Sequence, residues 1–282
     1  MPVHHDTTIY YEDIGTGTPF VFLHGNPVSS HVWRNVLPHI PGRRIAPDLI
    51  GMGRSGKPAI DYSFADHARY LDAFLDALGL DGIVLVGIDW GGALAFDWAA
   101  RHPGRVRGLA FMETIVRPMT IDELTPASRP RLQAFRTPGE GERLVLEENA
   151  MLNGALRATV LTPLSDADQT TYRAPYPTPE SRRPMLAWPR AFPVDGEPAD
   201  VTARFESFGE FLRTSPIPKL LLTFDGSPTL LIGPELTQWS QDNMAALEVT
   251  ACGPAGHMAP EDRPHEIATA ITTWATHHHL TP

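Results

Sequence analysis

Residues 83–101 read IVLVGIDWGGALAFDWAAR. The uninterrupted apolar run Ile83–Ile88 is typical of a parallel strand buried on both faces, and a helix is predicted over Gly91–Arg101. Between them, Gly87-Ile88-Asp89-Trp90-Gly91 has the small–any–nucleophile–any–small pattern of a strained turn that lifts its central side chain above a sheet. The stretch predicts that Asp89 is a nucleophile, although an aspartate here can also serve simply as a helix cap.

Strands and helices alternate on both sides of this turn. Strands are predicted at 9–12, 19–23, 44–46, 108–112, 219–224 and 247–251, and helices at 65–78, 238–246 and 265–276. Gly79 is the expected C-terminal cap of the first of these helices. The alternation predicts an α/β fold with a mostly parallel central sheet and flanking helices.

The middle of the chain has a different composition. Twelve prolines lie between Pro118 and Pro198, interrupted mainly by a helical segment around Arg143–Leu156. Proline at this density disfavours sheet and long helices, and the apolar residues among them argue against a disordered linker. We therefore expect a core domain formed by residues 1–117 and 214–282, with an inserted helical cap at 118–213.

The composition excludes several classes of function. The 282 residues are 42% hydrophobic and 20% charged, as in ordinary globular proteins, and the net charge of −10 disfavours a nucleic-acid surface. A single cysteine, Cys252, excludes a disulfide framework and a cysteine zinc site. Residues 1–13 lack the pattern of a signal peptide, and no apolar run is long enough to span a bilayer. We expect a cytoplasmic protein that binds neither nucleic acid nor membrane.

Two further segments place polar groups where a hydrolase needs them. His24-Gly25-Asn26-Pro27 follows an early strand, and His257 ends the glycine-rich stretch Cys252–His257 before the last helix. A nucleophile, then an acid, then a histidine is the chain order expected for a catalytic triad on this architecture. The run His277–His279 is most simply solvated, and we predict no metal site and no cofactor.

Over nearly its whole length the chain resembles the haloalkane dehalogenases of the α/β-hydrolase superfamily. The matching stretches are His24–Pro27, Ser29–Ser30, Trp33–Asn35, Ala46–Gly53, Tyr70–Ala73, Asp89–Gly91, Met112–Glu113, Gln133–Arg136, Gly196–Ala199 and Ser215–Lys219. Each stretch is weakly specific by itself, whereas all of them in register are highly specific. The resemblance implies an α/β-hydrolase fold with a helical cap.

The resemblance also implies a role for each matching residue. Asp89 would displace halide from a saturated carbon and form an alkyl ester, while the side-chain N–H groups of Asn26 and Trp90 receive the halide. His257 would then activate water to attack the ester, and Glu113 would orient His257. The products would be an alcohol, a halide ion and a proton.

A second residue is a candidate for the triad acid, and the residue before the nucleophile differs from the one usual in the family. Asp225 directly follows the strand at 219–224, where many relatives carry the acid, and Glu113 would then only cap a helix. The family usually has histidine where this chain has Ile88. Isoleucine removes a polar group beside the nucleophile, which leaves the local hydrogen bonding open.

The resemblance also predicts an apolar substrate pocket. Its expected lining is Leu124, Ala127, Leu132, Phe135, Met151 and Met258. At all of these except Phe135, relatives often carry an aromatic residue, so rigid ring volume is lost here. We expect a roomier or more adaptable pocket that favours larger bromides, unless neighbouring side chains fill the space.

Other functions stay open at this point. An epoxide hydrolase also uses an aspartate and a histidine, but it needs two acidic donors from the cap, for which Tyr172 and Tyr176 are the candidates. A coelenterazine luciferase-like enzyme shares the scaffold and triad, and a non-catalytic binding protein could have kept the fold. The preferred haloalkane, the enantiopreference and the oligomeric state do not follow from the sequence.

Overall fold

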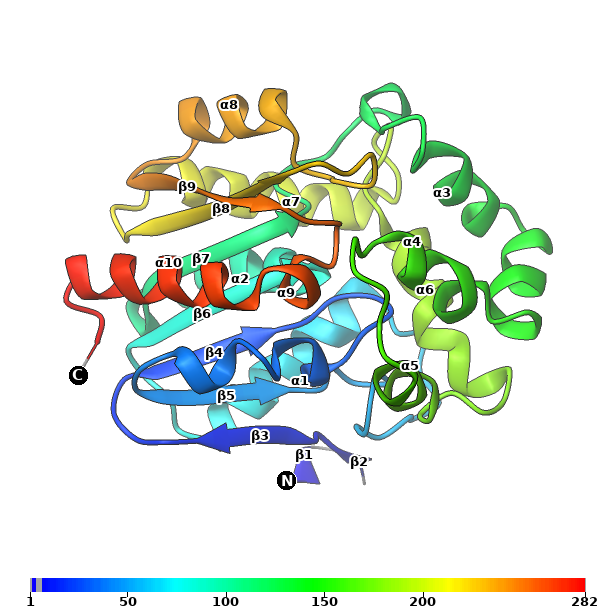
Figure 1. The fold of residues 1–282 in the computed structure, drawn as a ribbon, viewed down its shortest axis with the longest axis horizontal. Coiled ribbons are helices and arrows are strands. Elements are labelled where there is room, and N and C mark those ends of the chain that lie inside the picture. Colours follow the sequence, from blue (N-terminus) through cyan, green and yellow to red (C-terminus); the bar gives the residue numbers. More distant parts are fainter. Residues whose placement is uncertain (1, 4–6, 282) are drawn as a thin grey trace.

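The structure of the protein, a computed structural model, describes residues 2–3 and 7–281. Its main sheet has seven strands in the order β3-β5-β4-β6-β7-β8-β9 (Figure 1). The strands are β3 (Tyr11–Ile14), β4 (Pro19–Leu23), β5 (Arg43–Pro47), β6 (Ile83–Asp89), β7 (Val106–Thr114), β8 (Lys219–Asp225) and β9 (Leu247–Pro254). Only β3 is antiparallel to its neighbour, so the predicted mostly parallel sheet is confirmed. A separate small sheet pairs β1 (Pro2–Val3) with β2 (Thr7–Thr8).

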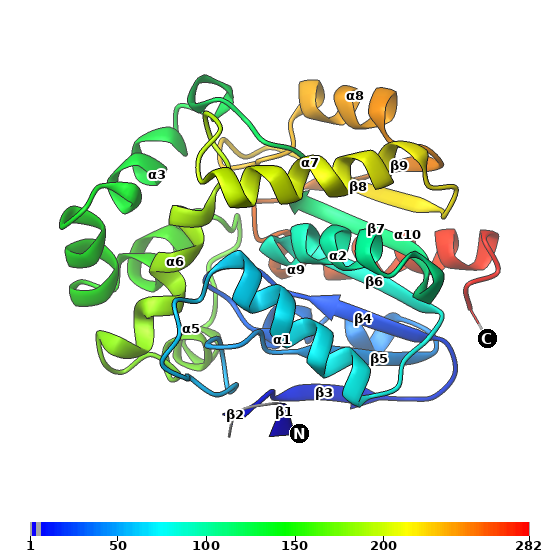
Figure 2. The ribbon, with the colours of Figure 1, turned by 180° about the vertical axis from the view of Figure 1, so that it is seen from behind.

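Helices cover both faces of the main sheet, with α1, α2 and α7 on one face and α10 on the other (Figures 1 and 2). The α-helices of these layers are α1 (Phe64–Ala77), α2 (Trp90–Arg101), α7 (Ala199–Thr214), α8 (Pro234–Asn243), α9 (Ala259–Asp262) and α10 (Pro264–His277). Short 3-10 helices are η1 (Ser30–Trp33), η2 (Leu37–His39) and η3 (Pro103–Arg105). Among the described residues, no helix combines the length and apolar character needed to cross a membrane.

Local sequence signals explain where the central elements begin and end. Every residue of β6 is buried, as expected for an inner parallel strand. Helix α1 starts at a capping box in which Ser63 and Asp66 bond each other's backbone N–H groups. Gly79, just beyond its end, has a φ of +58°, in the left-handed region that favours glycine. The predicted C-terminal cap is therefore confirmed.

The cap helices lie beyond the carboxyl ends of the parallel strands (Figure 1). They are η4 (Ile121–Glu123), α3 (Arg129–Arg136), η5 (Glu142–Glu147), η6 (Met151–Ala155), α4 (Leu156–Ala158), α5 (Asp166–Arg173), η7 (Glu180–Arg182) and α6 (Arg183–Ala191). The helix expected over 143–156 is not continuous. It consists of the two π-helical turns η5 and η6, separated where Asn149 adopts a φ of +54°, a conformation that asparagine tolerates.

Helix α7 lies in the range expected for the cap but packs on the core. Phe208 contacts Phe96 of α2 with 5.6 Å between ring centroids, and Arg204 pairs with Asp97 of α2 at 2.9 Å. These contacts put α7 in the helical layer over the sheet rather than above its edge (Figure 2). We therefore propose narrower bounds for the cap, 118–198.

Candidate active site

Asp89 stands at the carboxyl end of β6, where the chain turns sharply into α2. Its φ of +50° is strained for a residue with a side chain, and the register of β6 against β7 shifts between Ile88 and Asp89. The strain is held by Thr114, whose hydroxyl donates to the Asp89 carbonyl at 2.6 Å. A Cβ on Gly25 would lie 2.3 Å from Asp89 Oδ2, so only glycine lets these segments approach. Ile88 itself is wholly buried.

Two groups contact the Asp89 carboxylate. The backbone N–H of Asn26 donates to Oδ2 at 2.8 Å. His257 Nε2 lies 3.6 Å from Oδ1. One carboxylate oxygen therefore faces a hydrogen-bond donor of the chain and the other faces the imidazole.

Glu113, at the end of β7, is the acid that meets His257. His257 Nδ1 donates to Glu113 Oε2 at 3.0 Å. The same oxygen accepts from the backbone N–H of Leu231 at 2.7 Å, and Oε1 accepts from that of Ile232 at 3.1 Å. Glu113 is 1% exposed and also has a positive φ, +45°. Asp225, the alternative acid, is exposed and has no contact with His257 among the described residues.

The two carboxylates control the protonation of His257. Burial by itself would lower the pKa of the imidazole, but contacts with Asp89 and Glu113, and the charges of both, raise this pKa to about 10. The two carboxylates therefore favour the protonated imidazole in the resting site. Loss of the negative charge on one of them weakens that preference, so that His257 can act as a base.

Asn26 and Trp90 offer N–H groups beside Asp89. One N–H of the Asn26 amide donates to the Met185 carbonyl of α6 at 3.1 Å, which leaves its second N–H free. The Trp90 indole N–H has no hydrogen-bond partner among the described residues, and both side chains border the same cavity. Anion-binding groups of this kind suit a departing halide.

The Trp90 ring is held by a stack that the sequence analysis missed. Trp188 of α6 stacks on Trp90 with ring centroids 4.7 Å apart, and His67 of α1 stacks on the far side of Trp188 at 4.0 Å. Trp188 and His67 are buried, and burial lowers the pKa of His67 to about 3, so it is a neutral ring. The stack orients the indole plane of Trp90 from the cap side. The apolar position of Trp188 in the cap was the only sequence signal.

Two cavities meet at Asp89 and His257. One, of about 150 Å³, is lined by Asn26 and Trp90, and we call it the Asn26 cavity. The other, of about 160 Å³, is lined by Leu124 and Leu231, and we call it the Leu124 cavity. Each is smaller than the 300–1,000 Å³ typical of ligand pockets.

Most of the expected pocket residues border these cavities. Leu132 and Phe135 line both, Leu124 lines the Leu124 cavity, and Met151 and Met258 line the Asn26 cavity. Ala127 lines neither: it is exposed, in the turn closed by the bond from Ser128 N–H to the Thr125 carbonyl. Leu132, Phe135 and Phe192 line both cavities, so the two spaces adjoin, and the roomier or more adaptable pocket expected from the sequence stays a prediction.

The two cap tyrosines are engaged elsewhere. The Tyr172 hydroxyl donates to Glu261, and the Tyr176 hydroxyl accepts from the Gly53 N–H at 3.2 Å. Neither tyrosine lines the Asn26 or the Leu124 cavity. Burial raises the pKa of both phenols, which weakens them further as acids.

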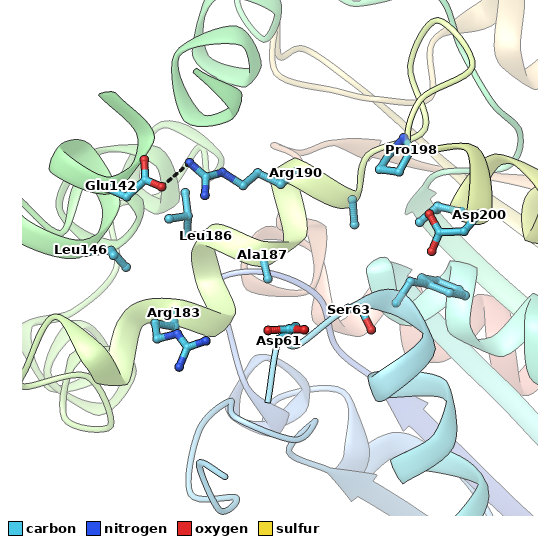
Figure 3. Close-up of a pocket in the computed structure, with 13 residues that line it drawn as sticks. Asp61, Ser63, Glu142, Leu146, Arg183, Leu186, Ala187, Arg190, Pro198 and Asp200 are labelled. Atoms are coloured by element: carbon cyan, nitrogen blue, oxygen red, sulfur yellow. Dashed lines mark ion pairs between the residues drawn. The ribbon is translucent and has the colours of Figure 1, made fainter. Parts of the chain in front are cut away.

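A larger cleft lies on the other side of α6. Its volume is about 430 Å³, and it runs between α6 and the starts of α1 and α7 (Figure 3). Leu186, Ala187 and Arg190 line this cleft, whereas Pro189 of the same helix lines the Asn26 cavity. The charge of Arg190 is paired with Glu142 at 2.7 Å. Helix α6 therefore separates the cleft from the catalytic groups.

A cluster of three surface side chains has the composition of a metal site. Glu248, His277 and His278 each offer a ligand atom, and these atoms lie within 4.8 Å of one another. His277 is 73% exposed, and Glu248 lies at the start of β9, away from the edge of the sheet that carries Asp89. This group is separate from the candidate active site.

Comparisons with known proteins agree with this geometry. A family model described as the alpha/beta hydrolase fold matches residues 18–264. A haloalkane dehalogenase of Mesorhizobium japonicum is 49% identical over 97% of this chain and 89% of that protein, and one of Bradyrhizobium diazoefficiens is 44% identical over 97% and 92%. The crystal structure of a haloalkane dehalogenase from Agrobacterium tumefaciens C58 is 42% identical, covers 98% of this chain and 95% of its own, and has a TM-score of 0.93. The resemblance seen in the sequence is confirmed: this chain belongs to the haloalkane dehalogenase family, within the α/β-hydrolase fold.

Proposed function

We propose that the protein hydrolyses halogenated alkanes to an alcohol, a halide ion and a proton through an ester on Asp89. The observation that carries this proposal is the set of groups placed around the Asp89 carboxylate. Asp89 has the imidazole of His257 on one side, and the N–H groups of Asn26 and Trp90 border the same cavity. A nucleophile, a base and an anion-binding pair are thus present at a single point.

In the first step an Asp89 oxygen forms a bond to the halogen-bearing carbon while the carbon–halogen bond breaks. The electron pair leaves with the halide, which the side-chain N–H groups of Asn26 and Trp90 bind. A carboxylate suits this displacement because it carries its charge at neutral pH. The stack of Trp188 on Trp90 keeps the indole donor in place.

In the second step water attacks the ester carbonyl as His257 Nε2 takes its proton. Alkylation has removed the charge of Asp89, and with it part of what raises the pKa of His257. His257 then releases its imidazolium proton to solvent and becomes a base at the stage that requires one. The backbone N–H groups of Asn26 and Trp90 stabilise the oxyanion, and the alkoxide leaves with the proton held by His257. Transfer of the Asp89 carboxyl proton to His257 restores the carboxylate and the imidazolium, so one proton is released per turnover.

The alternative enzymes find less support. An epoxide hydrolase would need acidic hydroxyls at the substrate, whereas Tyr172 and Tyr176 bond Glu261 and Gly53 instead. Neither a luciferase-like activity nor a binding role accounts for the halide donors beside Asp89. A cytoplasmic location stays part of the proposal, since a chain with one cysteine suits a reducing compartment.

The test is to follow halide and proton release from brominated and chlorinated alkanes of two to six carbons, with an epoxide as control. We expect one proton per halide from several bromides and no turnover of the epoxide. Turnover of the epoxide without halide release from any haloalkane would contradict the proposal.

A further inference from the structure

Arg131 brings a positive charge to the wall of the catalytic cavities. It lies on α3 beside Leu132, one turn after Ser128 and one turn before Phe135, so these four residues share one face of the helix. All four line the Leu124 cavity, and Arg131 also lines the Asn26 cavity. A guanidinium therefore borders a space that the sequence analysis expected to be apolar.

The charge of Arg131 is not used within the protein. Among the described residues, no hydrogen bond or ion pair engages its guanidinium, and it is only partly buried. The two other arginines of α3 are engaged: Arg129 pairs with Asp122 at 3.0 Å, and Arg136 donates to the Phe192 carbonyl at 2.6 Å. Packing of the cap thus explains Arg129 and Arg136 but not Arg131.

Among the described residues, no other charged group at the site pairs directly with Arg131. Asp89 and His257 are the other ionisable residues that line the cavities, and they lie 3.6 Å from each other. The second buried carboxylate, Glu113, bonds His257. Arg131 is therefore the cationic group available to a ligand that occupies the cavity above Asp89. The nearby Ser128 hydroxyl accepts from Thr125, which leaves its own O–H able to donate.

We propose that Arg131 is a substrate-binding residue that selects haloalkanes carrying a carboxylate at the end remote from the halogen. The inference rests on the proposed function. Asn26 and Trp90 line only one cavity and would receive the halide, whereas Arg131 lines both and would border the rest of the substrate chain. A guanidinium pairs with a carboxylate through two parallel hydrogen bonds, and the apolar Leu132 and Phe135 contact the methylene groups between.

The experiment compares 6-bromohexanoate with 6-bromohexanamide, which has the same length and no charge. In the wild type we expect a higher kcat/KM for the carboxylate than for the amide. Arg131→Leu should lower this ratio about tenfold, because a charge-assisted contact is lost. Arg131→Lys should restore part of it. Arg157→Leu is the matched control: Arg157 is an exposed cap arginine that lines neither cavity, so the ratio should stay unchanged.

The possible failures are distinguishable. An equal ratio in the wild type and in Arg131→Leu would overturn the inference while leaving the proposed function intact. An equal fall for both substrates would overturn it too, and would assign Arg131 to a step common to both, such as halide release. Failure of the wild type to release bromide from either substrate or from 1-bromohexane would instead contradict the proposed function itself.

Discussion

The two sides of the catalytic cavity are built differently. On the core side, Asp89 and Glu113 stand at the ends of neighbouring strands, have positive φ values and are fixed by hydrogen bonds from backbone N–H groups. On the cap side, Arg131 and Leu132 project from a helix of eight residues and remain partly exposed. The reacting carboxylates are thus fixed by backbone hydrogen bonds, whereas the cap residues that border the cavities are partly exposed.

This difference predicts that substitutions on the two sides of the cavity have different effects. Strained backbone persists only where the surroundings hold it, so a change on the core side should stop the reaction. The cap meets Asp89 through apolar walls and one cation, so a change there should alter which substrate reacts.

The largest effect is expected for Asp89→Asn. A neutral amide is a poor nucleophile, so bromide release from 1-bromobutane should fall by at least about 10,000-fold. Asp225→Asn is the matched control, because Asp225 is an exposed aspartate at the end of the next strand but one. Its rate should stay within about twofold of the wild type. Retained activity in Asp89→Asn would place the nucleophile elsewhere.

A smaller loss is expected for Glu113→Gln. Both oxygens of Glu113 accept from N–H groups, so a glutamine must point its own NH2 at a donor. Steady-state turnover should fall about a thousandfold through the hydrolytic step, by analogy with amide replacement of a triad acid. A rapid first release of bromide should persist in stopped-flow measurements. Normal turnover would show that Glu113 does not serve His257.

A moderate effect is expected from pH on the hydrolytic step. His257 acts as a base when deprotonated, so the rate of ester hydrolysis should rise as the pH rises. Because the ester has no charge at Asp89, the midpoint should lie well below the resting value of about 10. We expect a rise of about tenfold between pH 6 and pH 9, measured by quench-flow in a single turnover. A midpoint at 10 or above would mean that Asp89 does not set this pKa.

The smallest effect is expected for Leu132→Ala on the cap side. Leu132 lines both cavities, and its truncation should widen the space where they meet. The kcat/KM for branched bromides, relative to 1-bromobutane, should rise roughly threefold to tenfold. Leu146→Ala is the control, since Leu146 lines the cleft on the other side of α6. An unchanged ratio would show that side chains collapse into the space.

The same contrast explains what could be predicted from the sequence. Asp89, Glu113, His257, Asn26 and Trp90 stand out because their chemistry requires those residue types in that order. The parallel sheet follows from apolar runs such as Ile83–Ile88. The stack on Trp188, the unpaired charge of Arg131 and the cavity volumes depend on which distant side chains meet, and no local pattern encodes that.

The interruption at Asn149 and the place of α7 escaped prediction for a similar reason. A φ of +54° at Asn149 is compatible with the sequence but not required by it. Helix α7 follows the proline-rich segment, and its contacts with core helices, such as those with Phe96 and Asp97, are our reason for placing it with the core. Tertiary packing decided both features.

The central claim is the covalent ester on Asp89, and mass spectrometry of His257→Ala tests it most directly. Without the base the ester should accumulate, because displacement does not need His257. After reaction with 1-bromobutane, tryptic peptide 70–101 should gain the mass of one butyl group. This peptide contains five aspartates, so fragment ions must locate the adduct. We expect the adduct on Asp89, and no adduct in the double variant with Asp89→Asn. An adduct on another residue, or none with any reactive bromide, would contradict the ester mechanism.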